Sequence, residues 1–332
     1  MKKNKNEKRL RYIDIAKGIT ILLMIVGHVV KNPTQLSTIF SFHMPLYIIV
    51  SGFCFKDKSF KDEIKTMFFK LYIPTTIVLL GVYFIENYNS ISLLLLKKAF
   101  YMINVCYSYG SVIKYNFDGT GVLWLVYMLI AIRLLFKLNK RIAKDNNMLL
   151  TVIVLFESYI GYLLGNNGYY LPWSFDVALV CMIFYYVGYL FKEYNVLDNI
   201  YKSKLLILLL VCIWVIGINN SWFELAMRNY SSGLYGFIIA IAGSLVVIGI
   251  SKIIDNKTKY ISEFFAFCGR NSLYILFGHH IEWVLFKYGG ILDIKSSSNK
   301  ALTRRLLIIC KCSFSVFFAF IISKTKALIK QN

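Results

Sequence analysis

The chain has 332 residues, of which 58% are hydrophobic and only 17% are charged. A soluble domain needs a larger charged fraction to cover its surface, so this composition indicates a membrane protein and excludes disordered, collagen-like and disulfide-stapled secreted folds. The net charge is +21, from 38 Lys and Arg against 17 Asp and Glu. Such an excess is typical of basic cytoplasmic loops or of a nucleic-acid-binding surface, and the positions of the charges decide between the two.

Apolar runs close to the roughly 20 residues that cross a bilayer predict ten spanning helices. The fold class predicted from the sequence is therefore all-α, a polytopic helical bundle that forms a single transmembrane domain over 1–332 with no appended soluble domain. The predicted spans are 13–31, 38–55, 68–86, 121–136, 148–165, 174–191, 205–219, 233–251, 271–287 and 303–322.

The basic residues predict the orientation of these spans. If the N-terminus is cytoplasmic, the inside segments hold 23 Lys and Arg and the outside segments hold seven. Because positive charge accumulates on cytoplasmic loops, both termini are expected in the cytoplasm, and nucleic acid is unnecessary as a partner. The apolar segment 91–105 carries Lys97 and Lys98 at its centre, each costing about 2.5–3.5 kcal/mol at the bilayer midplane. We therefore expect it in the outer interface, within a long external loop over 87–120 that covers an outward-facing site.

The seven cysteines form no C-x-x-C pair and mostly fall within predicted spans. Such cysteines favour core packing, so neither a metal site nor a disulfide is expected.

Two of the four histidines are predicted to lie at one depth near the outer face. His28 is close to the end of the first span and His43 close to the start of the second. An imidazole there can serve as a base near neutral pH, or it can be an interfacial side chain whose tip reaches water. Asp176 opens the sixth span at a similar depth and is predicted to orient one of these rings. These three residues are the predicted catalytic group.

Further ionisable residues inside spans are candidate cavity-lining groups, because burying them in a membrane is costly. His279 and His280 lie in the middle of the ninth span, about 100° apart around the helix, so only one is expected to face a cavity. Glu157 is either a protonated acid bonded to a neighbouring helix or a functional group. Proton-coupled transport is an alternative use for such residues.

Basic residues also gather at the predicted cytoplasmic face, where most follow from the charge bias of the loops. Lys70 differs because it lies inside an apolar helix, which suits an anionic ligand such as the phosphates of a cofactor. Lys65 and Arg11 lie near it in this arrangement, and all three are predicted to bind a cofactor.

Several runs resemble the acyltransferase family 3 membrane proteins, particularly the subgroup similar to fucose 4-O-acetyltransferases. They are R-x-R-Y-I-D-I-A-K-G-I-x-I-L-L-M-I-V-G-H over 9–28, S-F-H-M-P-L-Y-x-x-x-S-G-F over 41–53, and G-R-N-S-L-Y-I-L-F-G-H-H over 269–280. The resemblance covers nearly the whole chain. It implies O-acylation of an extracytoplasmic glycan from cytoplasmic acyl-CoA, most simply acetyl-CoA, in a bacterial plasma membrane. Membrane lipid and other polysaccharide-biosynthesis proteins are the implied partners.

In that family the histidine matched by His28 is regarded as essential, and basic residues matched by Lys65 and Lys70 are thought to contact CoA. Many members carry arginine there, and lysine lacks its bidentate fork. Direct transfer and transient acylation of His28 both fit the sequence. The candidate oxyanion donors are Ser51, Tyr47, Trp124 and Asn271, and the last two are also candidate cavity-lining residues. The alternatives to an O-acyltransferase are a secondary transporter or glycan flippase and a lipid-binding scaffold. No internal duplication of the kind found in transporters is visible.

Overall fold

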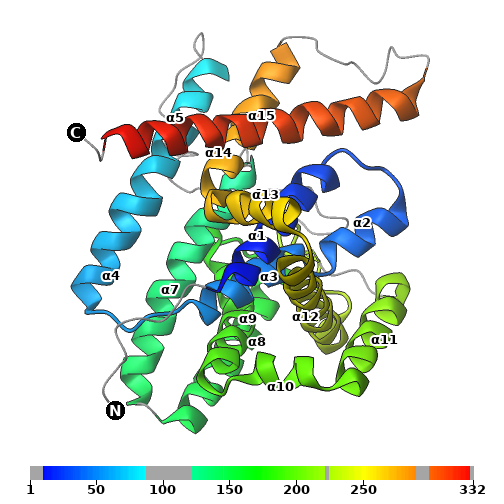
Figure 1. The fold of residues 1–332 in the computed structure, drawn as a ribbon. Helices are drawn as coiled ribbons and strands as arrows, with labels where there is room; N and C mark the ends of the chain where they lie inside the picture. Colours follow the sequence, from blue (N-terminus) through cyan, green and yellow to red (C-terminus); the bar gives the residue numbers. More distant parts are fainter. Residues whose placement is uncertain (1–9, 87–120, 145, 221–223, 289–298, 330–332) are drawn as a thin grey trace.

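The computed structural model describes residues 10–86, 121–144, 146–220, 224–288 and 299–329. These residues form helices joined mostly by short connections, as the apolar runs predict, and the all-α membrane fold is confirmed (Figure 1). In chain order the helices are α1 (Arg11–Gly27), α2 (Pro33–Phe40), α3 (His43–Phe53), α4 (Phe60–Met67), η1 (Phe68–Tyr72), α5 (Ile73–Glu86), η2 (Gly121–Leu123), α7 (Trp124–Ala143), α8 (Asn147–Asn166), η3 (Pro172–Ser174), α9 (Phe175–Glu193), α10 (Val196–Lys202), α11 (Lys204–Asn220), α12 (Gly233–Lys257), α13 (Lys259–Arg270), α14 (Ser272–Tyr288) and α15 (Lys300–Ile329).

Among the described residues, seven helices are long and apolar enough to cross a membrane, and eight if the bent pair α10 and α11 is one span. Two of the ten predicted spans, 13–31 and 271–287, correspond to α1 and α14, which have 17 residues each. The predicted span 38–55 is divided between α2 and α3, with the break just before His43. The orientation of the termini stays a prediction, and the segment 87–120 lies outside the described residues.

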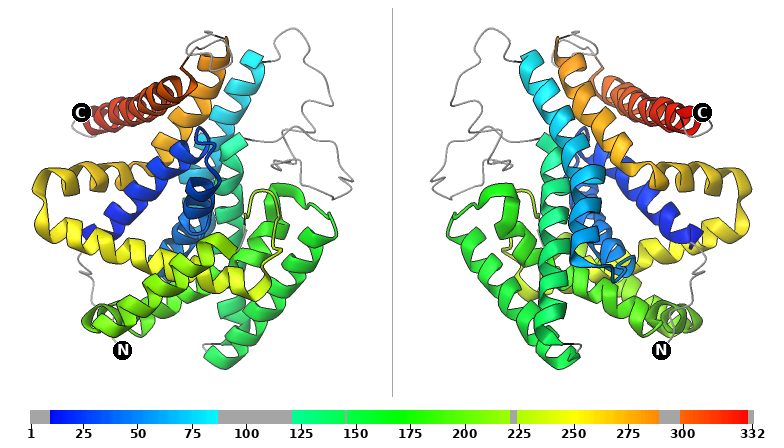
Figure 2. Two further views of the ribbon diagram at one scale, coloured as in Figure 1. Left: turned by 90° about the vertical axis from the view of Figure 1, so that its right-hand side faces the viewer. Right: turned by 90° about the vertical axis from the view of Figure 1, so that its left-hand side faces the viewer.

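Helix α1 occupies the middle of the bundle and contacts α3, α12, α13 and α14, as the views in Figures 1 and 2 show. Its closest approach is to α13, where Gly18 and Gly269 lie at the crossing and leave no side chain between the two backbones. A Cβ on Gly18 would meet the backbone carbonyl of Phe265, and one on Gly269 would meet that of Asp14. Small residues allow such close backbone packing of membrane helices. The crossing fixes α1, and with it the position of His28, relative to the start of α14.

Helices α3 and α9 cross in the same manner at Gly52 and Gly188. Around this crossing lies a core of aromatic and aliphatic side chains that also draws on α7 and α8, including the fully buried Phe136, Phe184 and Tyr185. Helix α3 is thereby held between α1 and α9. Its residues Tyr47 and Ser51 form one side of the cavity described next.

Candidate active site

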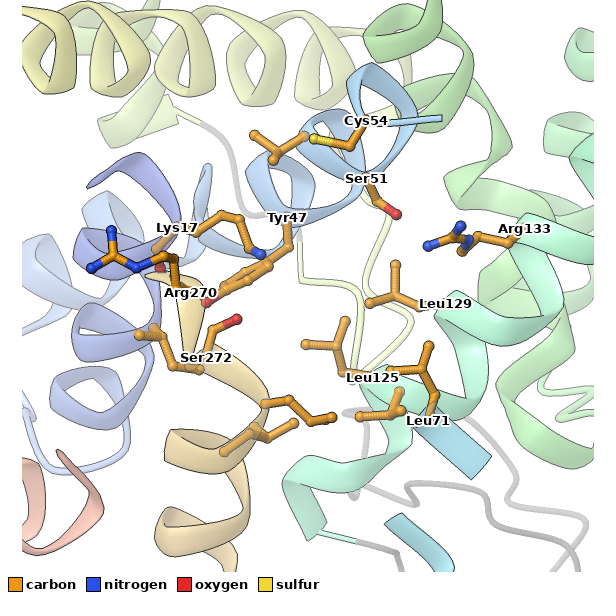
Figure 3. Close-up of a pocket in the computed structure, with 15 residues that line it drawn as sticks. Lys17, Tyr47, Ser51, Cys54, Leu71, Leu125, Leu129, Arg133, Arg270 and Ser272 are labelled. Atoms are coloured by element: carbon orange, nitrogen blue, oxygen red, sulfur yellow. Dashed lines mark hydrogen bonds between the residues drawn. The ribbon is translucent and has the colours of Figure 1, made fainter. Parts of the chain in front are cut away.

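A cavity of about 280 Å³ lies between α1, α3, α7 and α14 (Figure 3). Its walls are mainly aliphatic, with polar groups from α3 and α14. The lining residues are Lys17, Ile21, Tyr47, Val50, Ser51, Cys54, Leu71, Leu125, Val126, Leu129, Arg133, Arg270, Ser272, Leu273 and Leu276. A mostly apolar cavity with a few polar groups is the usual form of a small-molecule or cofactor site.

Two cationic side chains point into this cavity from opposite sides, Lys17 from α1 and Arg133 from α7 (Figure 3). Arg133 is held by the buried Glu63, with Nη2 2.8 Å and Nε 3.0 Å from Oε1. A guanidinium carries five N–H donors, so this pairing leaves donors for a second anion. The guanidinium of Arg270 points away from the cavity centre in the same view. This cationic end of the cavity is suited to phosphate groups.

One face of α1 leads from the cationic end to the predicted base. Lys17, Ile21 and His28 are spaced four and seven residues apart, so they lie on one face of the helix. The rise of 1.5 Å per residue places His28 about 16 Å from Lys17 along the axis. On α14, Leu276 lines the cavity and His279 follows three residues later on the same face. The cavity therefore points from its cationic end toward the histidines.

The structure brings His28 and His279 together. Their ring centroids are 5.3 Å apart, and Trp283 packs edge-on against both, at 5.4 Å from His28 and 5.7 Å from His279. His28 is exposed, whereas His279 is fully buried. An exposed and a buried imidazole in contact form a site at which a proton can be taken and returned.

The buried imidazole is anchored by an ion pair between α14 and α15. Nδ1 of His279 lies 2.7 Å from Oε1 of Glu282, and Nζ of Lys311 lies 2.8 and 2.6 Å from the two carboxylate oxygens. Glu282 is fully buried, and Lys311 is nearly so. The adjacent His280 faces a different neighbour, because its ring lies against Gly121. Of the two central histidines, the structure places His279 beside His28.

His43 is buried at the first residue of α3, where its Nδ1–H donates a hydrogen bond to the carbonyl oxygen of Ile39 at 2.9 Å. Its ring packs edge-on against Phe40 with centroids 4.9 Å apart. No ring contact joins His43 to His28 among the described residues. Trp124 lies buried in the core, and the side-chain amide of Asn271 donates to the carbonyl of Phe267. A role for these three in catalysis stays a prediction.

Asp176 is fully buried but lies in a different network from the histidines. Its carboxylate accepts hydrogen bonds from Nε and Nη2 of Arg228, at 2.8 and 3.3 Å, and from the backbone N–H of Leu171 at 3.1 Å. Burial raises the pKa of the nearby Glu224 carboxyl, which caps the turn that carries Arg228. This network ties the 224–232 connection to the start of α9. The other predicted carboxylate, Glu157, accepts a hydrogen bond from Asn139 at 2.6 Å.

The predicted cofactor-binding residues are all exposed and lie outside the lining of the cavity. Lys65 is on α4, and Lys70 lies in the π-helical turn η1. Arg11 pairs with Asp255, with Nε 3.2 Å from Oδ1, and also bonds to Ser262. Their binding of a cofactor stays a prediction.

Sequence reasoning missed Lys17, Arg133, Glu282 and Lys311 as site residues. The signal was present, because each is an ionisable residue inside a predicted span and such residues are rare in membranes. Within the described residues, no group of three or more His, Cys, Asp and Glu side chains could hold a metal ion.

Fold and site together define a polytopic helical membrane protein in which a cation-bearing apolar cavity is lined by two helices, α1 and α14, that also carry a pair of imidazoles. Residues 10–324 match the acyltransferase domain of the acyltransferase 3 family, and the chain belongs to this family. The match confirms the family predicted from the sequence and shows a membrane acyltransferase that transfers an acyl group other than an aminoacyl group. Comparisons with curated proteins and with solved structures give no match.

Proposed function

We propose that the protein is an O-acetyltransferase that moves an acetyl group from cytoplasmic acetyl-CoA to a sugar hydroxyl of a cell-surface or exported glycan. In this proposal it acts in the bacterial plasma membrane and groups with the fucose 4-O-acetyltransferase-like members of its family. The observation that supports the proposal best is the shared face of α1, which carries Lys17 in the cavity and His28 at the histidine pair.

The two ends of that face suit the two ends of an acyl-CoA. The CoA phosphates pair with cations, for which Lys17 and Arg133 are candidates beside Lys65, Lys70 and Arg11. The apolar walls between Ile21 and Leu276 accept the pantetheine chain, which directs the thioester toward His28. The long arm of CoA thus connects a cytoplasmic donor with a reaction centre deeper in the membrane.

His28 faces the acceptor, because it is the exposed member of the histidine pair. A sugar hydroxyl is a weak nucleophile, and an imidazole that takes its proton during attack contributes about 10²–10⁴-fold. The hydroxyl oxygen bonds to the thioester carbonyl carbon, the carbon–sulfur bond breaks, and CoA leaves as the thiol. Direct transfer and a transient acyl-histidine both use these groups.

The test is acetyl transfer by the purified protein in lipid nanodiscs, with radiolabelled acetyl-CoA and cell-surface glycan from the producing cells. We expect label in the glycan with the wild type and a loss of at least about 10²-fold with His28→Ala. Gln35→Ala, an exposed change on the adjacent α2, is the control and keeps full activity. Equal labelling by wild type and a folded His28→Ala protein would refute the role of His28. A transporter would leave acetyl-CoA intact.

A further inference from the structure

The histidine pair is asymmetric, and the proposed function uses only its exposed member. His279 is fully buried, and its Nε2 has no hydrogen-bond partner among the described residues. A buried polar atom without a partner costs about 1–3 kcal/mol. This ring is held in place by the carboxylate of Glu282, which lies on the same helix α14. The carboxylate is in turn paired with the ammonium of Lys311 on α15, the helix that crosses α14 (Figure 1). The ring is therefore fixed through Nδ1, and its unpaired Nε2 is left available to a reactant.

The protonation of His279 follows from its partners. The two short contacts with Lys311 identify Glu282 as an ionised carboxylate, and an ionised carboxylate only accepts hydrogen bonds. Nδ1 of His279 must therefore carry the proton that Glu282 accepts. Lys311 already balances the charge of Glu282, so a neutral imidazole leaves the cluster without net charge. Nε2 then presents a lone pair, and Glu282 is placed to stabilise the imidazolium that forms when Nε2 gains a proton.

The position of His279 places it on the donor side of the reaction. It follows the cavity-lining Leu276 by one turn of α14, and its ring contacts that of His28 with centroids 5.3 Å apart and planes inclined by 32°. His28, in contrast, is open to the surroundings of the protein. His28 is thus the imidazole that an acceptor can reach, and His279 lies one helical turn beyond the cavity-lining Leu276, on the side from which the thioester is proposed to arrive.

Resting on the proposed function, we propose that the two imidazoles divide the proton transfer, with His28 serving the acceptor hydroxyl and His279 serving the CoA sulfur. His28 takes the hydroxyl proton as the new oxygen–carbon bond forms. The proton passes to Nε2 of His279, where Glu282 stabilises it, and then to the sulfur as the carbon–sulfur bond breaks. The products are the ester and CoA thiol, and both imidazoles return to their neutral forms. Glu282 and Lys311 act as positioning residues through His279.

This division predicts opposite rescue patterns in two simple reactions. Transfer from acetyl-CoA to hydroxylamine uses a strong nucleophile but a poor leaving group, so it requires His279 and not His28. Transfer from p-nitrophenyl acetate to glycerol uses a good leaving group but a weak nucleophile, so it requires His28 and not His279. We expect His279→Asn to lose the first reaction by at least about tenfold and to keep the second. We expect His28→Asn to keep the first reaction and lose the second. Glu282→Gln should show the same pattern as His279→Asn, with a smaller loss of the first reaction.

A purely structural role of His279 lowers both reactions equally, and that result would overturn the proposal. The proposal is also overturned if His28→Asn and His279→Asn affect the two reactions in the same way. Nitrogen-15 NMR of histidine-labelled protein in nanodiscs gives a readout without activity, with the Nδ1–H tautomer expected for His279 and lost in Glu282→Ala. If the wild type transfers acetyl groups but the crossed pattern is absent, only the division of roles fails. If the wild type transfers to no acceptor from either donor, the proposed function fails and the division of roles falls with it.

Discussion

At the scale of single residues, the rarity of histidine and the cost of ionisable groups in a membrane were enough to single out His28 and the adjacent pair His279 and His280 from the sequence. The same rule applies to Lys17 and Arg133, which lie within predicted spans and line the cavity. Their roles depend on which helix faces they occupy relative to other helices. A single sequence gives the face of each helix but not its neighbour, so the pairing of Glu282 with Lys311 could not be predicted.

The cavity makes Lys17 a stronger candidate for CoA phosphates than Lys70, which is exposed in a π-helical turn. We expect Lys17→Gln to raise the KM for acetyl-CoA by about ten- to a hundredfold, the effect of losing one charge-assisted hydrogen bond of about 1.5–3 kcal/mol. Lys70→Gln should raise it less than about threefold, and neither change should alter the KM for the glycan. Steady-state kinetics check this. A larger effect at Lys70 would favour the cofactor-binding residues predicted from the sequence.

Asp176 was predicted to be catalytic, but its buried ion pair with Arg228 can also serve the stability of the fold. Substitutions at the two residues distinguish these roles. Asp176→Asn leaves the Arg228 charge without its carboxylate, so we expect a loss of about 3–5 kcal/mol in the free energy of unfolding. Combining Asp176→Leu with Arg228→Met removes both charges and should recover much of that stability, measured by thermal unfolding in detergent. A double variant that is stable but inactive in acetyl transfer would instead support a catalytic Asp176.

At the scale of helices, the site depends on close crossings that glycines permit. Apolar runs indicated the long helices, but α7, α12 and α15 continue six or seven residues beyond the predicted ends at 136, 251 and 322. The interruption between α2 and α3 was not visible in the hydropathy pattern. The predicted span 38–55 runs through it, because both helices are apolar. Where helices cross is decided by shape, and the small residues at the crossings have no distinctive hydropathy.

The crossing of α3 and α9 gives a matched pair of glycine substitutions. A Cβ on Gly52 would meet the backbone carbonyl of Tyr185, whereas a Cβ on Gly81 of α5 has no neighbour within 4 Å. We expect Gly52→Ala to destabilise the protein by about 1–3 kcal/mol because rigid backbone must move apart. Gly81→Ala should be neutral or stabilising by up to about 1 kcal/mol, because alanine favours the helix. Thermal unfolding of both variants checks this, and equal stabilities would contradict the packing at α3 and α9.

At the scale of the whole molecule, the distribution of basic residues predicts an orientation in the membrane. We expect a cysteine at position 110, in the predicted external loop, to react with a membrane-impermeant maleimide added to intact cells. A cysteine at position 58, in a predicted cytoplasmic loop, should react only after the cells are opened. The native cysteines are replaced beforehand, and glycan acetylation confirms that the protein still works. Labelling of position 110 from the cytoplasmic side alone would contradict the predicted topology.

The amino-acid sequence by itself determined the membrane class, the helical fold and the family, because composition, apolar runs and local motifs are properties of neighbouring residues. It also singled out His28, whose cost in a membrane is a local property. Only the tertiary structure decided that His279, rather than His43, contacts His28, and that Asp176 pairs with Arg228. The cavity between α1, α3, α7 and α14 was likewise visible only in the tertiary structure. These contacts join residues far apart in the chain, and helix crossings, set by side-chain shape and small residues, bring them together.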